Sequence, residues 1–172
     1  MLLHLLAVGD VVGQGGLDLL GRHLRSLKKL HNVDFTVVNG ENASGVGLTP
    51  KQAQAILDAG ADVITLGNHT WNRLQIKDFL EESPYILRPA NYPKRLPGRG
   101  YGVFDGPRGL RIGVMNLIGR LELPPHNDSP FTTADSILKQ PDANIVVVDF
   151  HAEATSEKGA MGYYLDGRVQ AV

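Results

Sequence analysis

The sequence predicts an α/β layered fold in which a mixed, mostly parallel sheet is flanked by helices. Short apolar runs rich in β-branched residues, typical of buried strands, alternate with segments whose apolar residues recur at helical spacing. A glycine-rich turn over 9–16 follows the first apolar run, as expected where a strand leads into a helix. Two apolar runs at 101–104 and 110–116 are joined by a short turn, which predicts an antiparallel pair within the sheet.

The first strands are expected in the N-terminal half, at about 2–8, 33–38 and 62–66. The first of them is nearly all apolar, as strands covered on both faces are. Between the first two strands, leucines recur at helical spacing through Leu30, which predicts a helix; these are Leu17, Leu20, Leu24 and Leu27.

A second helix is marked at both of its ends. Thr49 is expected to cap its N-terminus, Pro50 suits the first helical position, and Gln52 completes a capping box with Thr49. Gly60 is expected to end this helix. A short helix marked by apolar residues is expected next, stopping at Ser83-Pro84; these residues are Ile76, Phe79 and Leu80.

The C-terminal half begins with an irregular loop over 88–100, which holds three prolines and two glycines. A second irregular stretch is expected over 119–130, followed by a helix that Thr132 or Thr133 caps and that runs to about Gln140. The remaining expected elements are a strand over 144–149, a helix over 156–166 and a new strand over 168–172. Because the sequence stops in that strand, we expect residues 1–172 to form a single domain that lacks its C-terminal part.

Composition excludes several classes of protein. The 172 residues carry a net charge of −1, so no overall positive field attracts nucleic acid or an anionic membrane. Cysteine is absent, which excludes disulfides and thiolate metal sites and leaves Asp, Glu, Asn and 6 His as ligands. No apolar stretch approaches the roughly 20 residues of a membrane span, and the N-terminus lacks the basic region of a signal peptide. We therefore expect a cytoplasmic protein without a membrane partner; a homo-oligomer is compatible with the sequence.

Polar residues able to bind a metal or move a proton stand where four of the predicted strands end. They are Asp10, the pair Glu41 and Asn42, the pair Asn68 and His69, and His151. In an open α/β sheet, ligands bind beyond the carboxyl ends of the strands. The sequence therefore predicts one site to which four strands contribute.

The residue types of this site suit metal-dependent hydrolysis. Carboxylate, amide and imidazole groups without sulfur bind ions such as Zn, Fe, Mn, Co or Ni. Two ions about 3.5–4 Å apart hold the attacking and leaving oxygens of a phosphoryl displacement and generate hydroxide at neutral pH. His69 is a candidate to protonate the leaving oxygen. Taken singly, each residue also fits a turn, a cap or core packing, so the prediction depends on their meeting at one edge.

Arginines and aromatic residues supply secondary candidates. Arg88 and Arg120 lie in or beside irregular loops and are candidates to bind a substrate phosphate, with solvated surface arginines as the alternative. Trp71 either lines the pocket or packs under the loop, and Tyr92 either stacks on a base or packs in the core or at the rim.

Several sequence blocks resemble a known family. The pairs and triplets GD at 9–10, GEN at 40–42 and GNH at 67–69 resemble signature blocks of the calcineurin-like metallophosphoesterases. More narrowly, the chain resembles the YmdB-like family of bacterial metallophosphoesterases in the segments GDVVGQGG, VVNGENASGVG, TLGNHTWN, RPANYP and VDFHAEATSEKGAMGYYLDGRV. It departs from many phosphoesterases at Val12, where they carry a histidine. Family members also continue to a Gly-Thr-His-Thr-His segment with two more ligands, which this sequence does not contain.

The resemblance implies a metallophosphoesterase-like fold and a hydrolase that cleaves phosphodiesters such as 2′,3′-cyclic nucleotides. It implies two divalent or mixed-valence ions, described for the family with iron and here open to manganese or zinc. By position, Asp10 and Asn42 bind the first ion and Glu41 bridges both. Asn68 and His151 bind the second ion. A hydroxide between the ions attacks phosphorus, and His69 donates the proton.

Other functions remain as alternatives. The main one is a non-catalytic nucleotide-sensing or scaffolding module that retains a partial metal site. A serine esterase needs a serine after Gly9-Asp10, where Val11 stands. A dinucleotide-binding turn needs the spacing G-x-G-x-x-G, which the segment 9–16 does not have.

Overall fold

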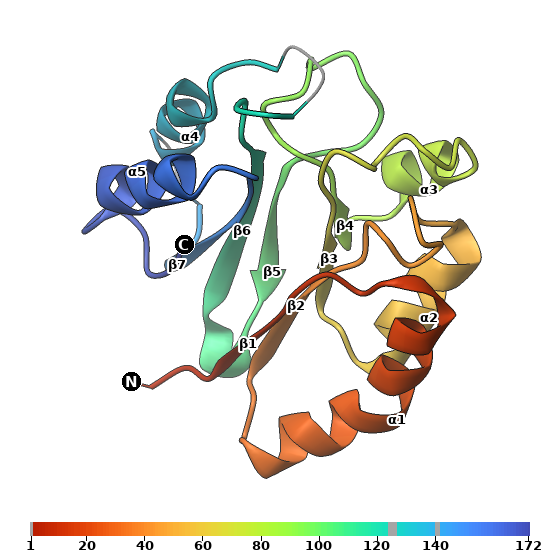
Figure 1. Ribbon diagram of the computed structural model, residues 1–172. Helices are drawn as coiled ribbons and strands as arrows, with labels where there is room; N and C mark the ends of the chain where they lie inside the picture. Colours follow the sequence, from red (N-terminus) through yellow and green to blue (C-terminus); the bar gives the residue numbers. More distant parts are fainter. Residues whose placement is uncertain (1, 124–126, 140–141) are drawn as a thin grey trace.

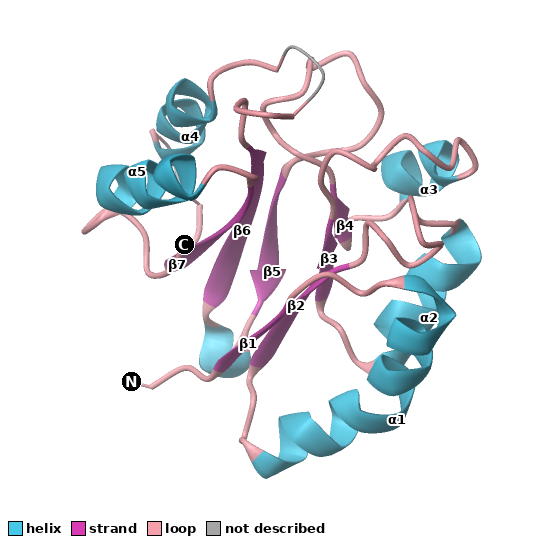
Figure 2. Ribbon diagram, viewed as in Figure 1, coloured by secondary structure: helices cyan, strands magenta, loops and turns pink. Residues whose placement is uncertain are grey.

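Two β-sheets pack face to face, and helices cover the outer face of each sheet (Figures 1 and 2). The computed structural model describes residues 2–123, 127–139 and 142–172. The four layers confirm the predicted α/β fold with mostly parallel strands flanked by helices. The strands are divided between two sheets, however, where the sequence predicted one. The alternation of β and α segments does not show which strands become neighbours, so it could not predict this division.

The first sheet is parallel throughout and has the order β1-β2-β3-β4. Its strands are β1 (Leu5–Val8), β2 (Phe35–Asn39), β3 (Val63–Thr65) and β4 (Ile86–Leu87). The strand β4 was not expected from the sequence, since two residues are too few to give a periodic signal. Because the strands are parallel, their carboxyl ends lie at one edge of the sheet.

Three helices cover the outer face of this sheet: α1 (Gly13–Leu30), α2 (Pro50–Ala59) and α3 (Ile76–Glu82). The capping box of α2 is confirmed. The Thr49 hydroxyl accepts from the backbone N–H of Gln52, whose side chain accepts from the N–H of Thr49. Gly60 ends α2 in the left-handed conformation, with φ 114°. No helix in the described part of the chain combines the length and apolar composition needed to cross a membrane.

The second sheet has the order β5-β6-β7, in which β6 pairs antiparallel with β5 and parallel with β7. Its strands are β5 (Tyr101–Asp105), β6 (Arg111–Ile118) and β7 (Ile145–His151), with a 3₁₀ turn η1 (Pro107–Gly109) between β5 and β6. The predicted antiparallel pair is therefore confirmed. The segment expected as a last strand pairs with β7 at one bridge, Val147 to Ala171.

Two helices, α4 (Pro130–Leu138) and α5 (Thr155–Leu165), cover the outer face of the second sheet. The predicted cap of α4 is wrong. The helix begins at Pro130 with Ser129 at the cap position, because proline is already suited to the first turn. Pro124, Pro125 and Gln140, which the predicted loop and helix include, lie outside the described residues.

Apolar side chains fill the space between the sheets. Phe35 and Val37 of the first sheet pack with Ile112 and Val114 of the second in one buried cluster. The buried amide of Asn116 also joins the sheets, since its Nδ2 donates to the carbonyl oxygens of Leu66 at 2.6 Å and Leu87 at 2.8 Å. This packing brings the end of β7 to the same edge as the ends of β1, β2 and β3.

Candidate metal centre

The loops after β1, β2 and β3 join three predicted site residues through short side-chain contacts. Nδ2 of Asn42 donates to Oδ2 of Asp10 at 2.7 Å, and Oδ1 of Asn42 lies 2.6 Å from Nδ1 of His69. The backbone N–H of His69 donates to Oε2 of Glu41 at 3.0 Å. Three loops that are separate in sequence therefore meet at one edge of the first sheet.

The second sheet adds His151 to the same group. Nδ1 of His151 lies 3.0 Å from Oε1 of Glu41, and its Nε2 lies 2.8 Å from Oδ1 of Asn68. All six residues predicted as metal ligands or proton donor are thus connected to one another by hydrogen-bond distances. The link runs in order through Asp10, Asn42, His69, Glu41, His151 and Asn68.

Backbone hydrogen bonds between neighbouring loops hold this group in place. The N–H of Val11 donates to the carbonyl of Asn39 at 3.0 Å, and the N–H of Gly13 donates to the carbonyl of Asn42 at 2.9 Å. The Asn39 side chain accepts from the N–H of Glu41 at 3.3 Å. Backbone hydrogen bonds therefore join the turns after β1 and β2.

Gly67 gives Glu41 and His151 the space to approach. A Cβ atom at position 67 would lie 2.6 Å from both carboxylate oxygens of Glu41 and 2.6 Å from Cγ of His151. Real Cβ atoms do not come this close to other atoms. The close packing of Glu41 and His151 against this position therefore requires the glycine before Asn68.

The charges of Glu41 and His151 support each other. Burial alone would raise the pKa of Glu41, but the hydrogen bond and charge of His151 and the N–H of His69 hold that pKa below its usual value. Burial would lower the pKa of His151, but the carboxylate of Glu41 raises it above its usual value. We therefore expect the pair to be ionised in the metal-free protein.

Tyr92 and Asp149 lie beside the site; Tyr92 was a secondary candidate from the sequence, whereas Asp149 was not among the candidates. Tyr92 is buried, packs against Trp71 and donates from its hydroxyl to the carbonyl of Gly67 at 3.2 Å. Burial, with the charge of Glu41, raises the pKa of Tyr92 to about 12. Burial also raises the pKa of Asp149, whose carboxylate accepts from the hydroxyl of Thr65 on β3. Periodicity gives no signal for such contacts between distant segments.

The two predicted phosphate-binding arginines lie in different environments. Arg88 is buried, and its guanidinium donates to three carbonyls of its own loop: Pro89 at 2.8 Å, Pro97 at 3.0 Å and Leu96 at 3.2 Å. Burial also lowers its pKa. The prediction that Arg88 binds substrate is therefore corrected, because its donors already hold the irregular loop together. Arg120 is exposed and stays a candidate.

The donor groups at this edge fit a metal ion in their chemistry. Carboxylate, amide and imidazole donors meet without sulfur, and Gly67 leaves the close space that two of them need. Within residues 2–123, 127–139 and 142–172, no three His, Cys, Asp or Glu side chains are gathered closely enough to hold a metal ion. Asp10 reaches Glu41 only through Asn42 and His69, so a ligand set at this edge would need the amide oxygens as well.

The fold and this donor set define a metallophosphoesterase-like domain. A family model described as YmdB-like protein matches residues 6–172, and the chain therefore belongs to the YmdB-like family.

Relatives of known sequence and structure agree with this assignment. The chain is 44% identical over 173 residues to a 2′,3′-cyclic-nucleotide 2′-phosphodiesterase of Bacillus subtilis (strain 168), covering 99% of this chain and 65% of that protein. A crystal structure of a hypothetical protein from Thermus thermophilus has a TM-score of 0.89 at 36% identity, covering 96% of this chain and 64% of the other. A novel phosphatase of Mycoplasma pneumoniae has a TM-score of 0.89 at 31% identity, covering 98% and 62%. The chain thus spans less than two thirds of the length of these relatives.

Proposed function

We propose that this chain is the catalytic part of a metal-dependent phosphodiesterase, with residues 1–172 acting as one domain. The observation that carries this proposal is the continuous set of contacts from Asp10 to Asn68, which links four strand ends and both sheets. Two carboxylates, two amides and two imidazoles at one edge are more than a turn or a cap uses. Donors of these types suit the ions that metal-dependent hydrolases employ.

The metal-binding residues in this proposal are Asp10, Glu41, Asn42, Asn68 and His151. The resemblance to the family implies two divalent ions, and the donor types suit iron, manganese or zinc. Bound ions would polarise the phosphoryl oxygens and supply a nucleophile at neutral pH. Glu41 lies at the centre of the set, since it contacts both His69 and His151. Each ligand must be deprotonated to bind, so ion binding would replace the contact between Glu41 and His151.

His69 is the proposed proton donor, and Asn42 orients it. Because Nδ2 of Asn42 donates to Asp10, its carbonyl oxygen faces Nδ1 of His69. A carbonyl oxygen only accepts, so Nδ1 of His69 carries a hydrogen and donates it to Asn42. Nε2 is therefore the ring nitrogen left to face the leaving oxygen. Asn42 and Asp10 fix the ring in the orientation that this transfer needs.

The proposed substrates are small phosphodiesters, including 2′,3′-cyclic nucleotides. The Bacillus subtilis relative carries that activity in its name, and it is 44% identical to this chain. A cyclic phosphodiester presents one negative charge, which ions held by these residues would neutralise. The exposed Arg120 is the remaining candidate for a phosphate contact.

Turnover of bis-p-nitrophenyl phosphate by the Mn²⁺-loaded chain tests the proposal. We expect turnover that EDTA abolishes and that falls by about 100-fold or more in Asp10→Asn. His69→Ala is expected to lose turnover while it retains bound metal. His23→Ala, which removes an exposed imidazole on α1, is the matched control and is expected to be unaffected. Equal activity in wild type, Asp10→Asn and EDTA-treated protein would exclude the proposed chemistry.

A second candidate is a nucleotide-binding scaffold without catalysis. It is favoured by the observation that the described residues hold no three-ligand group of His, Cys, Asp or Glu. In this case the chain would bind 2′,3′-cyclic nucleotides, with an affinity that EDTA does not change, and would hydrolyse neither these nor bis-p-nitrophenyl phosphate.

A further inference from the structure

Glu157 is a buried acidic residue that has no place in the candidate metal centre. It lies in the first turn of α5 and is only 8% exposed. The backbone N–H of Arg120 donates to its Oε1 at 2.9 Å and to its Oε2 at 3.0 Å. The N–H of Leu121 donates to Oε2 at 3.3 Å. Both carboxylate oxygens are thus directed at the loop that follows β6.

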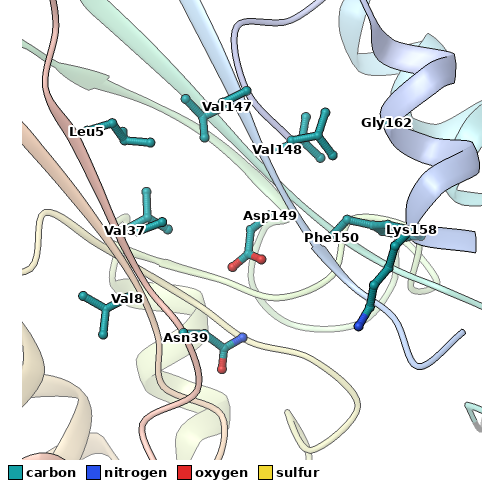
Figure 3. A pocket seen from close by; sticks show the side chains of 14 residues that line it. Leu5, Val8, Val37, Asn39, Val147, Val148, Asp149, Phe150, Lys158 and Gly162 are labelled. Atoms are coloured by element: carbon teal, nitrogen blue, oxygen red, sulfur yellow. The ribbon is translucent and has the colours of Figure 1, made fainter. Parts of the chain in front are cut away.

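The carboxylate of Glu157 is balanced by backbone groups and not by a cation. In the part of the chain that the structure describes, Glu157 forms no ion pair. Figure 3 shows that the next residue of α5, Lys158, places its side chain in the cleft between the sheets, which Asp149 also lines. A buried charge is costly unless hydrogen bonds satisfy it. The loop after β6 supplies these hydrogen bonds.

This loop lies against the candidate metal centre. The N–H of Gly119 donates to the carbonyl of His151 at 2.8 Å, and Arg120 is the next residue. A Cβ atom at position 119 would overlap Oε2 of Glu157 and would lie 2.9 Å from Cβ of Ala152. The close packing of the loop therefore requires glycine here. The carbonyl of His151 and the carboxylate of Glu157 together fix the loop beside a proposed metal ligand.

The end of β6 is held on its other side as well. Nδ2 of Asn91 donates to the carbonyl of Ile118 at 2.7 Å, and the N–H of Ile118 donates to Oδ1 of Asn91 at 2.9 Å. The strand β6 contributes none of the predicted metal ligands. Fixing its end therefore serves the side chains that the following loop carries, and Arg120 is the charged residue at its start.

Arg120 is free to meet a ligand. Its side chain is exposed, and it has no hydrogen-bond or ion-pair partner among the described residues. It lines an open cleft of about 600 Å³ with Leu121 and Ser156. A guanidinium binds phosphate through two parallel N–H bonds, so its orientation decides whether both bonds form. A fixed backbone at Arg120 limits the orientations that must be ordered on binding.

We propose that Glu157 is a positioning residue that holds Arg120 where its guanidinium contacts the phosphate of a phosphodiester at the metal centre. This role depends on the proposed function, because that function brings the phosphodiester to the centre. Glu157 itself does not touch the substrate and acts through the loop 119–121. Glutamine cannot replace it, since an amide accepts at one atom and donates at the other, which would set N–H against N–H.

Hydrolysis of bis-p-nitrophenyl phosphate by the Mn²⁺-loaded chain tests this role. We expect Arg120→Met and Glu157→Gln each to raise KM about tenfold, as loss of one charge-assisted hydrogen bond does, with kcat within about twofold. The double variant is expected to have the KM of Arg120→Met alone, because Glu157 acts through Arg120. Glu82→Gln, the same change at an exposed position on α3, is the matched control and is expected to be unaffected.

Two measurements do not require turnover. Amide exchange in a peptide covering 117–123 is expected to be about tenfold faster in Glu157→Gln and unchanged in Arg120→Met. The Mn²⁺ affinity of both variants is expected to stay within about twofold of the wild type, since neither residue is a proposed metal ligand. Circular dichroism reports whether each variant is folded. If Glu157→Gln does not fold, Glu157→Ala removes the carboxylate without adding a donor and takes its place.

The outcomes distinguish this role from the proposed function. Turnover with unchanged KM in either single variant, or effects that multiply in the double variant, would overturn the role of Glu157 alone. Unchanged amide exchange or weakened Mn²⁺ binding in Glu157→Gln would overturn it too. A wild type without turnover would exclude the proposed function, and the Kd of 2′,3′-cyclic AMP in Mn²⁺ then replaces KM, with the same tenfold losses expected. A wild type that neither turns over nor binds would overturn both.

Discussion

Nδ1 of His151 lies 3.0 Å from Oε1 of Glu41, so an ion-pair contact joins the two sheets at the centre of the candidate site. Glu41 stands in the loop after β2 of the first sheet, and His151 ends β7 of the second. The position of one donor relative to the other therefore depends on how the sheets pack. Changes that shift this packing are expected to weaken metal binding even when no ligand is altered.

Replacement of Gly67 by alanine tests the close approach of these two residues. A Cβ atom there would lie 2.6 Å from the carboxylate of Glu41 and from the ring of His151, so one side chain must move. We expect Gly67→Ala to weaken Mn²⁺ binding by about tenfold or more, as loss of a supporting contact does. Titration calorimetry measures this change.

Gly21→Ala is the matched control for Gly67→Ala. A Cβ atom at position 21 meets nothing within 4 Å, and alanine in a helix is more stable than glycine by about 0.5–1 kcal/mol. We expect unchanged metal affinity and slightly increased stability for Gly21→Ala. Equal metal affinity of both variants and the wild type would contradict the proposed role of the space at Gly67.

The stability of the metal-free chain is expected to depend on pH through Glu41 and His151. The pKa of Glu41 is below its usual 4.5 in the folded chain, so its contribution is complete above 4.5 and is lost as pH falls through the lowered value. The pKa of His151 is above its usual 6.5, so its contribution is complete below 6.5 and is lost as pH rises through the raised value. The pair thus contributes most to the stability of the folded chain between pH 4.5 and pH 6.5.

Urea unfolding in EDTA across this pH range measures the effect. We expect the wild type to lose about 2 kcal/mol on leaving the window in either direction, the magnitude of a hydrogen bond to a charged group. Glu41→Gln removes the charge that shifts His151, and its profile is expected to be flatter. Parallel profiles for wild type and Glu41→Gln would show that the pair does not contribute.

Replacing Arg88 is expected to lower the stability of the chain, whereas replacing Arg120 is not. Arg88→Met removes a buried guanidinium that donates to three loop carbonyls, so we expect the free energy of unfolding to fall by about 2–4 kcal/mol. Arg120→Met changes an exposed side chain and is expected to alter stability by less than about 0.5 kcal/mol. Denaturant unfolding of both variants compares them. Equal stability of the two would mean that the contacts of Arg88 are not structural.

Local signals in the sequence predicted much of the fold. The capping box of Thr49 and Gln52 and the stop at Gly60 depend on neighbouring residues alone, and both were confirmed. Strand ends could be recognised because an apolar run is followed by a polar residue, which is how His151 was found.

Long-range relationships could not be predicted in the same way. The division into two sheets depends on which strands become neighbours, and β4 is too short to give a pattern. Arg88 was misassigned because the local sequence of a proline-rich loop is the same whether its arginine faces solvent or donates to the loop carbonyls. The contact of Tyr92 with Gly67 joins two loops, so no local pattern could show it.

The most direct measurement is titration of Mn²⁺ into metal-free chain, compared between wild type, Glu41→Gln and Glu82→Gln. Glu41 is buried at the centre of the site, whereas Glu82 is exposed at the end of α3 and serves as the control. The account predicts saturable binding in wild type and Glu82→Gln, with affinity reduced about tenfold or more in Glu41→Gln. Equal binding by all three proteins, or no binding by the wild type, would contradict it.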